Sequence, residues 1–132
     1  EYYRKKAKET EKYMDEYHVS DGIQSVWAYI ARTNKYIDET APWALAKNEE
    51  DREKLKNVMY NLAESLRRIA IMVRPFIANT SDKILEQLGL ETNVSWEDLC
   101  KENAIPAGTK VVEKAEILFT RLDKLFLLKW VV

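Results

Sequence analysis

The sequence predicts an all-α fold, an antiparallel helical bundle followed by a short extended C-terminal segment. Apolar residues recur at helical spacing over most of the chain. Only three Gly and three Pro occur among 132 residues, which is too few for an all-β sandwich with many tight turns. The hydrophobic share of 46% is enough for one globular core. We therefore expect one helical unit over residues 1–105 and an extended segment over 106–132.

The first two helices are marked by charge and by capping residues. Residues 1–17 mix Lys and Glu, which is typical of a helix with a solvated face. Ser20 is a candidate N-cap for the second helix, and Asp21 places a carboxylate in its first turn, where the helix dipole favours it. Pro42 cannot continue a helix, so the second helix should end just before it.

One face of the second helix is predicted to point into the core. Its apolar residues repeat at about 3.6-residue spacing. Asn34 falls on the same stripe, and we expect it to be buried and hydrogen-bonded rather than in direct contact with a ligand. The residues expected on this inward face are Ile23, Val26, Trp27, Ile30 and Ile37.

The longest helix should run from a cap at Asn48 to a break at Pro75. Its apolar residues form an almost unbroken stripe, and its polar face should carry Arg67, Arg68 and Arg74. The residues expected in the core stripe are Leu55, Val58, Met59, Leu62, Leu66, Ile69, Met72 and Val73.

The C-terminal third changes character along its length. Residues 76–88 predict another helix stopped by Gly89, and Ser95 with Asp98 predicts a capping box that opens a short helix. Residues 111–119 are rich in β-prone side chains and favour a strand or a short hairpin. The strongly apolar run 125–132 is compatible with either a buried strand or an exposed tail.

Composition excludes several classes of function. A single His and a single Cys exclude a disulfide framework and a four-Cys or paired-His metal site. They also argue against Ser-His-Asp or Cys-His catalysis. The three Gly are too far apart for a phosphate-binding loop. The 21 Lys and Arg against 22 Asp and Glu argue against a generic polyanion binder. No apolar run reaches the about 20 residues needed to span a bilayer, so we expect a cytoplasmic protein with a binding role and no membrane association.

Trp43, at the corner that follows Pro42, is the main candidate for a binding residue. On physical grounds alone, core packing is the favoured interpretation of a Trp in this setting. The alternative is an exposed aromatic face that stacks on an unpaired base, with Arg32, Lys35 and Lys47 supplying phosphate contacts.

The run from Arg32 to Lys47 resembles the anticodon-binding domain of methionyl-tRNA synthetases, which carries an Asn-x-Tyr-x-x-x-x-x-Pro-Trp signature. Here the signature residues are Asn34, Tyr36, Pro42 and Trp43. The similarity covers nearly the whole chain. It continues through the long helix and reaches the segments Arg74-Pro-Phe-Ile77, Ile84-Leu-Glu-Gln-Leu-Gly89, Ser95-Trp96 and Ile117-Leu-Phe-Thr-Arg-Leu-Asp123.

The resemblance implies that Trp43 stacks on an anticodon base of tRNA(Met), that Pro42 holds the corner, and that Asn34 and Arg32 support recognition. Lys35 and Lys47 are the further RNA-binding candidates. It also implies that residues 1–105 lack the family's first helix, which reads base edges with an Asn and an Arg. The catalytic domain is an expected partner and lies outside this sequence. With it lie ATP, Mg²⁺ and the Zn²⁺ knuckle, so we expect neither catalysis nor a cofactor in this chain.

A different class of function is the alternative to RNA recognition. In it the chain is a helical protein-interaction or scaffold module without RNA binding, and Trp43 and the tyrosines are core residues. Titration of the chain with an anticodon stem-loop at two salt concentrations separates these two interpretations, because only RNA recognition predicts salt-sensitive binding that favours the CAU loop.

Overall fold

The computed structural model describes residues 1–120, and within them the chain forms helices and no strand. The all-α prediction is therefore confirmed. The helices are α1 (Tyr2–Asp15), α2 (Val19–Thr40), α3 (Pro42–Leu45), α4 (Arg52–Val73) and α5 (Ala78–Gln87), with the 3₁₀ helices η1 (Glu49–Asp51) and η2 (Trp96–Cys100). The apolar run 125–132 lies outside the described residues.

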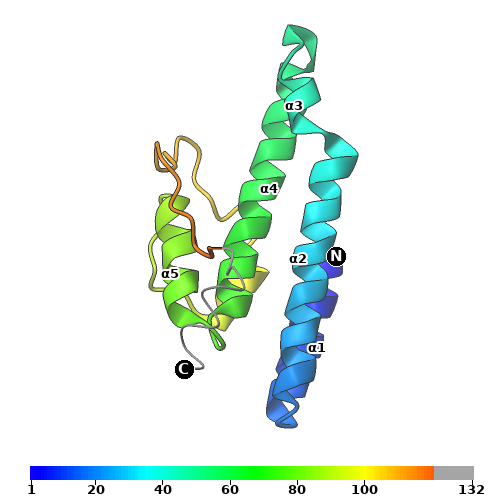
Figure 1. The fold of residues 1–132 in the computed structure, drawn as a ribbon, viewed down its shortest axis with the longest axis vertical. Helices are drawn as coiled ribbons and strands as arrows, with labels where there is room; N and C mark the ends of the chain where they lie inside the picture. Colours follow the sequence, from blue (N-terminus) through cyan, green and yellow to red (C-terminus); the bar gives the residue numbers. More distant parts are fainter. Residues whose placement is uncertain (121–132) are drawn as a thin grey trace, which may run out of the picture.

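Successive long helices run in opposite directions (Figure 1). α1 packs against the lower half of α2, α4 returns beside α2, and α5 packs against the lower half of α4. α3 and η1 connect α2 to α4 at the upper end of the molecule, beyond the reach of α1 and α5. The corner that contains Trp43 therefore stands at one end of the bundle.

Two separate groups of buried apolar side chains hold the helices together. The larger group joins α1, α2, α4 and η2 and contains Tyr3, Val26, Tyr29, Ile69, Ile71, Met72, Val73 and Leu99. The smaller group, which we call the corner cluster, joins α2, α3 and α4 and consists of buried Leu45, Val58 and Leu62 with partly buried Tyr36, Ile37 and Leu55. Full burial of such side chains stabilises the fold by roughly 1.5–3 kcal/mol each.

The buried face of α2 differs from the predicted one. Ile23 and Trp27 are exposed, and Asn34 is exposed instead of buried. The residues that face the core include small ones, because α1 lies against this side of α2. A Cβ added to Gly22 would lie 3.2 Å from the sulfur of Met14. The buried residues of α2 are Gly22, Ser25, Val26, Tyr29 and Thr33.

The predicted faces of α4 are also wrong in part. Met59 and Leu66 are exposed, whereas Arg67 is almost completely buried. The burial of Arg67 follows from the segment after η2, which crosses this side of α4. The guanidinium of Arg67 donates hydrogen bonds of 2.9 Å to the backbone carbonyl oxygens of Asp98 and Lys101. A cation expected on the solvated face thus fastens the C-terminal segment to the bundle.

Residues 101–120 are irregular, so the strand or hairpin predicted for 111–119 is wrong. These residues lie against the end of α5. The backbone amide of Val112 donates to the carbonyl oxygen of Gln87 at 3.1 Å, and the backbone amide of Glu116 donates to the side-chain oxygen of Gln87 at 3.1 Å. Ile117 and Phe119 are exposed. β-prone residues need a neighbouring strand to pair with, and residues 1–120 provide none.

Most helix boundaries follow the predicted signals. Ser95 and Asp98 form the expected capping box, and Gly89 has the positive φ of 70° that favours glycine after a helix. α2 begins one residue before the predicted cap Ser20. Within residues 1–120, none of the helices has the combination of length and apolar composition that crossing a membrane requires.

Candidate nucleic-acid interface

The corner between α2 and α3 is built on a left-handed residue. Ala41 has φ 41° and ψ 61° and is at once the last cap of α2 and the first cap of α3. Its amide donates to the carbonyl of Ile37 at 2.9 Å, and its carbonyl accepts from the amides of Ala44 at 2.8 Å and Leu45 at 3.3 Å. Pro42 fits the first position of α3, because no helical hydrogen bond is needed from its nitrogen there. The chain therefore turns sharply while its backbone groups remain paired.

The corner directs Trp43 outward. Its side chain is 57% exposed, so the core-packing interpretation favoured on physical grounds is wrong, while base stacking by Trp43 stays a prediction. Leu45, two residues later, is only 8% exposed. Residues two apart on a helix point in directions that differ by about 200°, so burial of one leaves the other facing solvent. An exposed indole at a fixed corner is able to stack on a planar ligand.

The cations near the corner are less available than the sequence suggests. Arg32 Nη1 lies 3.1 Å from a carboxylate oxygen of Glu39, and Lys35 Nζ lies 3.9 Å from the other oxygen of the same group. Lys47 is exposed and has no ion-pair partner within residues 1–120. It is followed closely by the acidic residues Glu49, Glu50 and Asp51. The corner is therefore a mixed-charge surface and not a basic patch.

The six predicted site residues do not form one continuous surface. Arg32, Lys35 and Glu39 lie along one side of α2. Lys35 follows Arg32 by three residues and Glu39 follows Lys35 by four, which are the spacings of neighbours on one helix face. Asn34 is about 200° of helix rotation away from Arg32 and therefore points to another side of α2. Pro42 and Trp43 belong to α3, and Lys47 follows α3. The structure thus provides an exposed Trp43 and two separate polar sides of α2, one with Arg32 and Lys35 and the other with Asn34.

The sequence patterns did not predict the residues on which the corner packs. Leu45 reaches into the corner cluster, where it meets Val58 and Leu62 of α4. Tyr36 packs against the same cluster, and its hydroxyl accepts a 3.4 Å hydrogen bond from the side-chain amide of Asn61. The sequence does contain a signal for this arrangement. Among the six residues that follow Pro42, only Trp43 and Leu45 are large and apolar, so one of them is expected to pack against the bundle.

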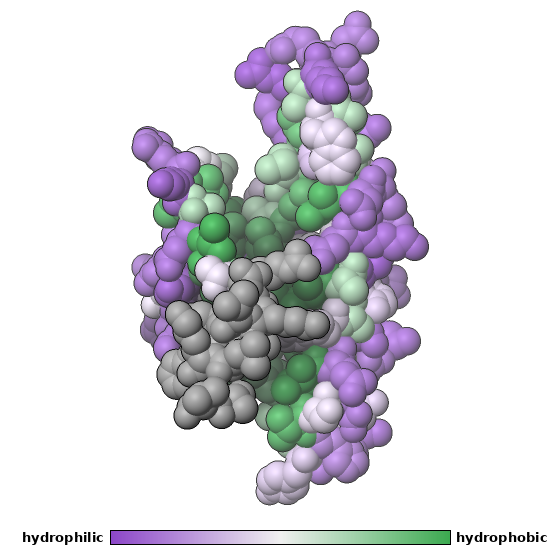
Figure 2. Space-filling model, viewed as in Figure 1, coloured by the Kyte–Doolittle hydropathy of each residue, from purple (hydrophilic) through white to green (hydrophobic). Residues whose placement is uncertain are grey.

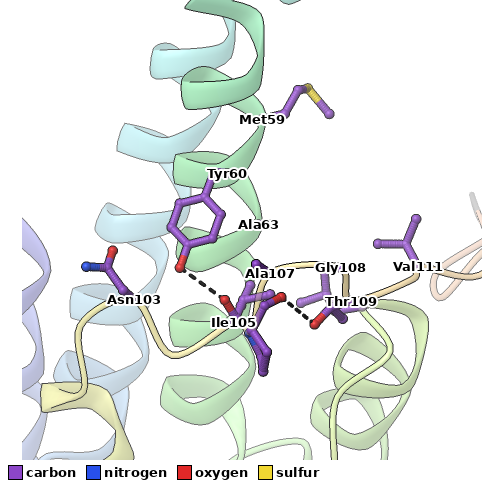
Figure 3. A pocket seen from close by; sticks show the side chains of 11 residues that line it. Met59, Tyr60, Ala63, Asn103, Ile105, Ala107, Gly108, Thr109 and Val111 are labelled. Atoms are coloured by element: carbon purple, nitrogen blue, oxygen red, sulfur yellow. Dashed lines mark hydrogen bonds between the residues drawn. The ribbon is translucent and has the colours of Figure 1, made fainter. Parts of the chain in front are cut away.

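A second concave surface lies between α4, the end of α5 and the loop 103–111 (Figure 3). It encloses a cavity of about 660 Å³ lined mostly by apolar side chains, among them Met59, Leu88 and Val111. Its loop is held in place by the hydroxyl of Tyr60, which donates to the carbonyl of Ile105 at 3.2 Å. Figure 2 shows hydrophobic side chains gathered along the middle of this face, while the upper end and the edges are hydrophilic.

The cavity is lined by no His, Cys, Asp or Glu. Across residues 1–120, no three such side chains converge in a way that could hold a metal ion. Fold and corner together define a class of protein, the all-α binding domain that presents an aromatic side chain at one end of its bundle.

Comparison with known proteins identifies the family. The family described as the anticodon binding domain of methionyl tRNA ligase matches residues 1–131. The chain is 49% identical over 118 residues to methionine–tRNA ligase 1 of Bacillus anthracis, an alignment that covers 88% of this chain and 18% of that protein. It is 50% identical over 119 residues to the methionine–tRNA ligase of Listeria monocytogenes, covering 89% of this chain and 18% of that protein.

The chain therefore belongs to the anticodon-binding domain family of methionyl-tRNA ligases. It spans 18% of the length of these relatives, so it corresponds to one part of an aminoacyl-tRNA synthetase. The resemblance carried by the run from Arg32 to Lys47 is confirmed.

Proposed function

We propose that this chain binds the anticodon loop of tRNA(Met) and that Trp43 stacks on an unpaired base of the loop. The observation that carries the proposal is the 57% exposure of Trp43 at the end of the bundle, in a chain of the anticodon-binding family. Unpaired loop bases are free to stack on aromatic side chains, which is the usual way in which proteins read single-stranded RNA. The mixed charge around the corner suits recognition by stacking, with a smaller part for phosphate contacts.

The other predicted residues have supporting roles in this proposal. Pro42 holds the corner that presents Trp43. Lys47, Arg32 and Lys35 contact phosphates, the latter two after releasing Glu39. Asn34 is exposed and offers an amide that can donate to and accept from a base edge or a ribose.

In the whole protein, base identity at the anticodon would favour productive docking of the acceptor end in the catalytic domain. That domain would attach methionine to tRNA in an ATP-dependent reaction. The catalytic domain is thus the proposed second partner of this chain, and the cytoplasm is the proposed location.

The test is binding of a fluorescently labelled anticodon stem-loop with a CAU loop to the 132-residue chain at low salt. Stacking of one base on an aromatic side chain contributes about 1–3 kcal/mol, so Trp43→Ala should weaken binding by about fivefold to 150-fold. Trp27→Ala is the matched control, because Trp27 is also about half exposed, at 52%, and lies about 20 Å away along α2. This control should bind as tightly as the unchanged chain.

Two outcomes would contradict the proposal. Equal affinities for Trp43→Ala and the unchanged chain would mean that Trp43 does not stack on the RNA. Absence of any salt-sensitive binding at low salt would favour the helical protein-interaction or scaffold module, for which the apolar face in Figure 2 is a candidate contact surface. A further readout in a full-length relative is aminoacylation of tRNA(Met), which Trp43→Ala should depress while methionine activation stays nearly unchanged.

A further inference from the structure

We infer that Leu45 is a positioning residue for Trp43: its burial in the corner cluster fixes the α2–α3 corner and so holds the indole ready to stack. The inference rests on the proposed RNA binding for its functional consequence. Its structural part concerns the free protein and is testable without RNA.

The first step is that the corner is attached to the bundle at few points. α3 contains only the four residues Pro42–Leu45, and of these Leu45 alone is buried. Trp43 and Ala44 are exposed, and Pro42 is partly buried. A helix of one turn has little stability of its own, so its position depends on tertiary contacts. Leu45 supplies the one buried side chain through which α3 contacts the bundle.

The second step is that the corner cluster is separate from the main core. Leu45 meets Val58 and Leu62 of α4 and is flanked by Tyr36 and Ile37 of α2. None of these residues belongs to the larger buried group near α1 and η2. Loss of the Leu45 side chain should therefore loosen the end of the bundle and leave the main core packed.

The third step is that the backbone at the corner needs to be held. Ala41 has φ 41°, in the left-handed region that side chains with a Cβ rarely adopt. Such a conformation persists only where the surroundings enforce it. The amide of Leu45 donates to the carbonyl of Ala41, so the buried residue and the strained residue are linked directly. Release of Leu45 would let Ala41 relax and Trp43 swing away from its fixed direction.

The consequence is that Trp43 is ordered before RNA arrives. A side chain that is already fixed loses less conformational freedom on binding, and this raises affinity without any new contact. Leu45→Ala should therefore weaken RNA binding by about threefold to tenfold, although Leu45 itself does not touch RNA.

The experiment uses ¹⁹F NMR of the 132-residue chain labelled with 5-fluorotryptophan, with the Trp43 signal assigned by Trp43→Phe. In Leu45→Ala, we expect the Trp43 signal to move toward that of a freely mobile indole, while the Trp27 and Trp96 signals stay in place. Leu45→Met should restore both the Trp43 signal and the RNA affinity, because Met fills a similar volume. Leu88→Ala is the matched control, because Leu88 has the same 8% exposure as Leu45 but follows α5 and does not belong to the corner cluster.

The result that would overturn the inference is an unchanged Trp43 signal together with unchanged RNA affinity in Leu45→Ala. If Leu45→Ala displaces all the Trp signals, Val58→Ala decides, because it removes the other side of the same contact with a smaller change in volume. A Trp43 signal that stays in place in Val58→Ala would then mean that the cluster is only structural. Failure of the proposed RNA stacking would give a different pattern from failure of the Leu45 inference. Trp43→Ala would then leave RNA affinity unchanged, while the NMR signal of Trp43 would still respond to Leu45→Ala.

Discussion

Arg32 Nη1 lies 3.1 Å from the Glu39 carboxylate, two helical turns further along α2. Lys35 approaches the same carboxylate at 3.9 Å. In the proposed complex, this one acidic side chain would compete with RNA for two of the three candidate phosphate contacts. Glu39→Gln should therefore tighten RNA binding. An exposed ion pair contributes about 0.2–1 kcal/mol, which predicts a gain of about 1.4-fold to fivefold in affinity for the CAU stem-loop at low salt.

Glu16→Gln is the control for this prediction. Glu16 pairs with Lys12 at the same four-residue spacing and the same 3.9 Å, but at the opposite end of the bundle (Figure 1). Both variants change the net charge by the same amount, so a general electrostatic effect would appear equally in the two. Equal gains in affinity would mean that Arg32 and Lys35 do not contact the RNA.

Lys47 should account for about a third of the salt dependence of RNA binding. Each phosphate contact on a single strand contributes about −0.7 to the slope of log K against log salt concentration. Three cations would give about −2 at most on the same scale, and Lys47→Ala should make the slope shallower by about 0.7. The measurement is binding of the labelled stem-loop at four or five salt concentrations. Lys8→Ala, on the exposed side of α1, should leave the slope unchanged, and a slope that is the same in all three proteins would exclude a phosphate contact from Lys47.

The corner could be predicted from sequence because its signals are local. Proline cannot continue the helix that precedes it, and the spacing of Asn34, Tyr36, Pro42 and Trp43 identifies the family without reference to packing. Whether Trp43 is buried could not be predicted, because exposure depends on which neighbouring residue occupies the space beneath α3. Leu45 occupies this space, and local sequence patterns do not show whether Leu45 or Trp43 is the buried residue.

The errors on α2 and α4 have a different origin. Helical spacing shows that a face is apolar, but it does not show which neighbour approaches it. α1 approaches α2 along the small side chains of Gly22 and Ser25, which hydropathy undervalues, so Trp27 is left in solvent. Arg67 was expected in water, since charged residues are rarely buried without partners. Its partners are Glu64 and carbonyl groups more than 30 residues away in sequence.

Ala41→Gly should stabilise the fold slightly. The left-handed conformation costs a residue with a Cβ about 1–2 kcal/mol, whereas glycine loses about 0.5–1 kcal/mol through its greater freedom in the unfolded chain. The net expectation is a gain of up to about 1.5 kcal/mol, measured by urea unfolding followed by circular dichroism. Ala44→Gly, inside α3, should instead destabilise by up to about 1 kcal/mol. Destabilisation of similar size in both variants would contradict the strained conformation of Ala41.

Glu64→Gln should be strongly destabilising. Glu64 is 3% exposed, and its carboxylate lies 3.2 Å from Arg67 and 3.1 Å from Arg68. The variant keeps the shape but leaves two largely buried guanidinium groups without their counter-ion, which typically costs about 3–5 kcal/mol. It would also weaken the 2.9 Å hydrogen bond from the amide of Ile105. Urea unfolding measures the effect, and Glu53→Gln, in an exposed pair with Lys56, should cost less than about 1 kcal/mol. Similar stability of the two variants would show that Glu64 contributes no more to stability than an exposed ion pair does.

Asp98 should make stability depend on pH in the acid range. The side chain of Lys101, at 2.6 Å, and the amide of Ser95, at 2.7 Å, bind its carboxylate and lower its pKa from 3.8 to about 2. Because the pKa is lower in the folded than in the unfolded chain, ionised Asp98 stabilises the fold above about pH 4. This contribution is lost as the pH falls toward 2.

The variant that isolates this contribution is Asp98→Asn, which keeps the shape of the side chain but does not titrate. At pH 7 it should reduce the free energy of unfolding by about 0.5–2 kcal/mol, the usual range for a helix cap. The difference from the unchanged chain should shrink between about pH 4 and pH 2. Glu97→Gln, on the neighbouring exposed residue, is the control. A difference that does not vary with pH would mean that the loss in Asp98→Asn comes from altered packing of η2 and not from the charge of the capping carboxylate.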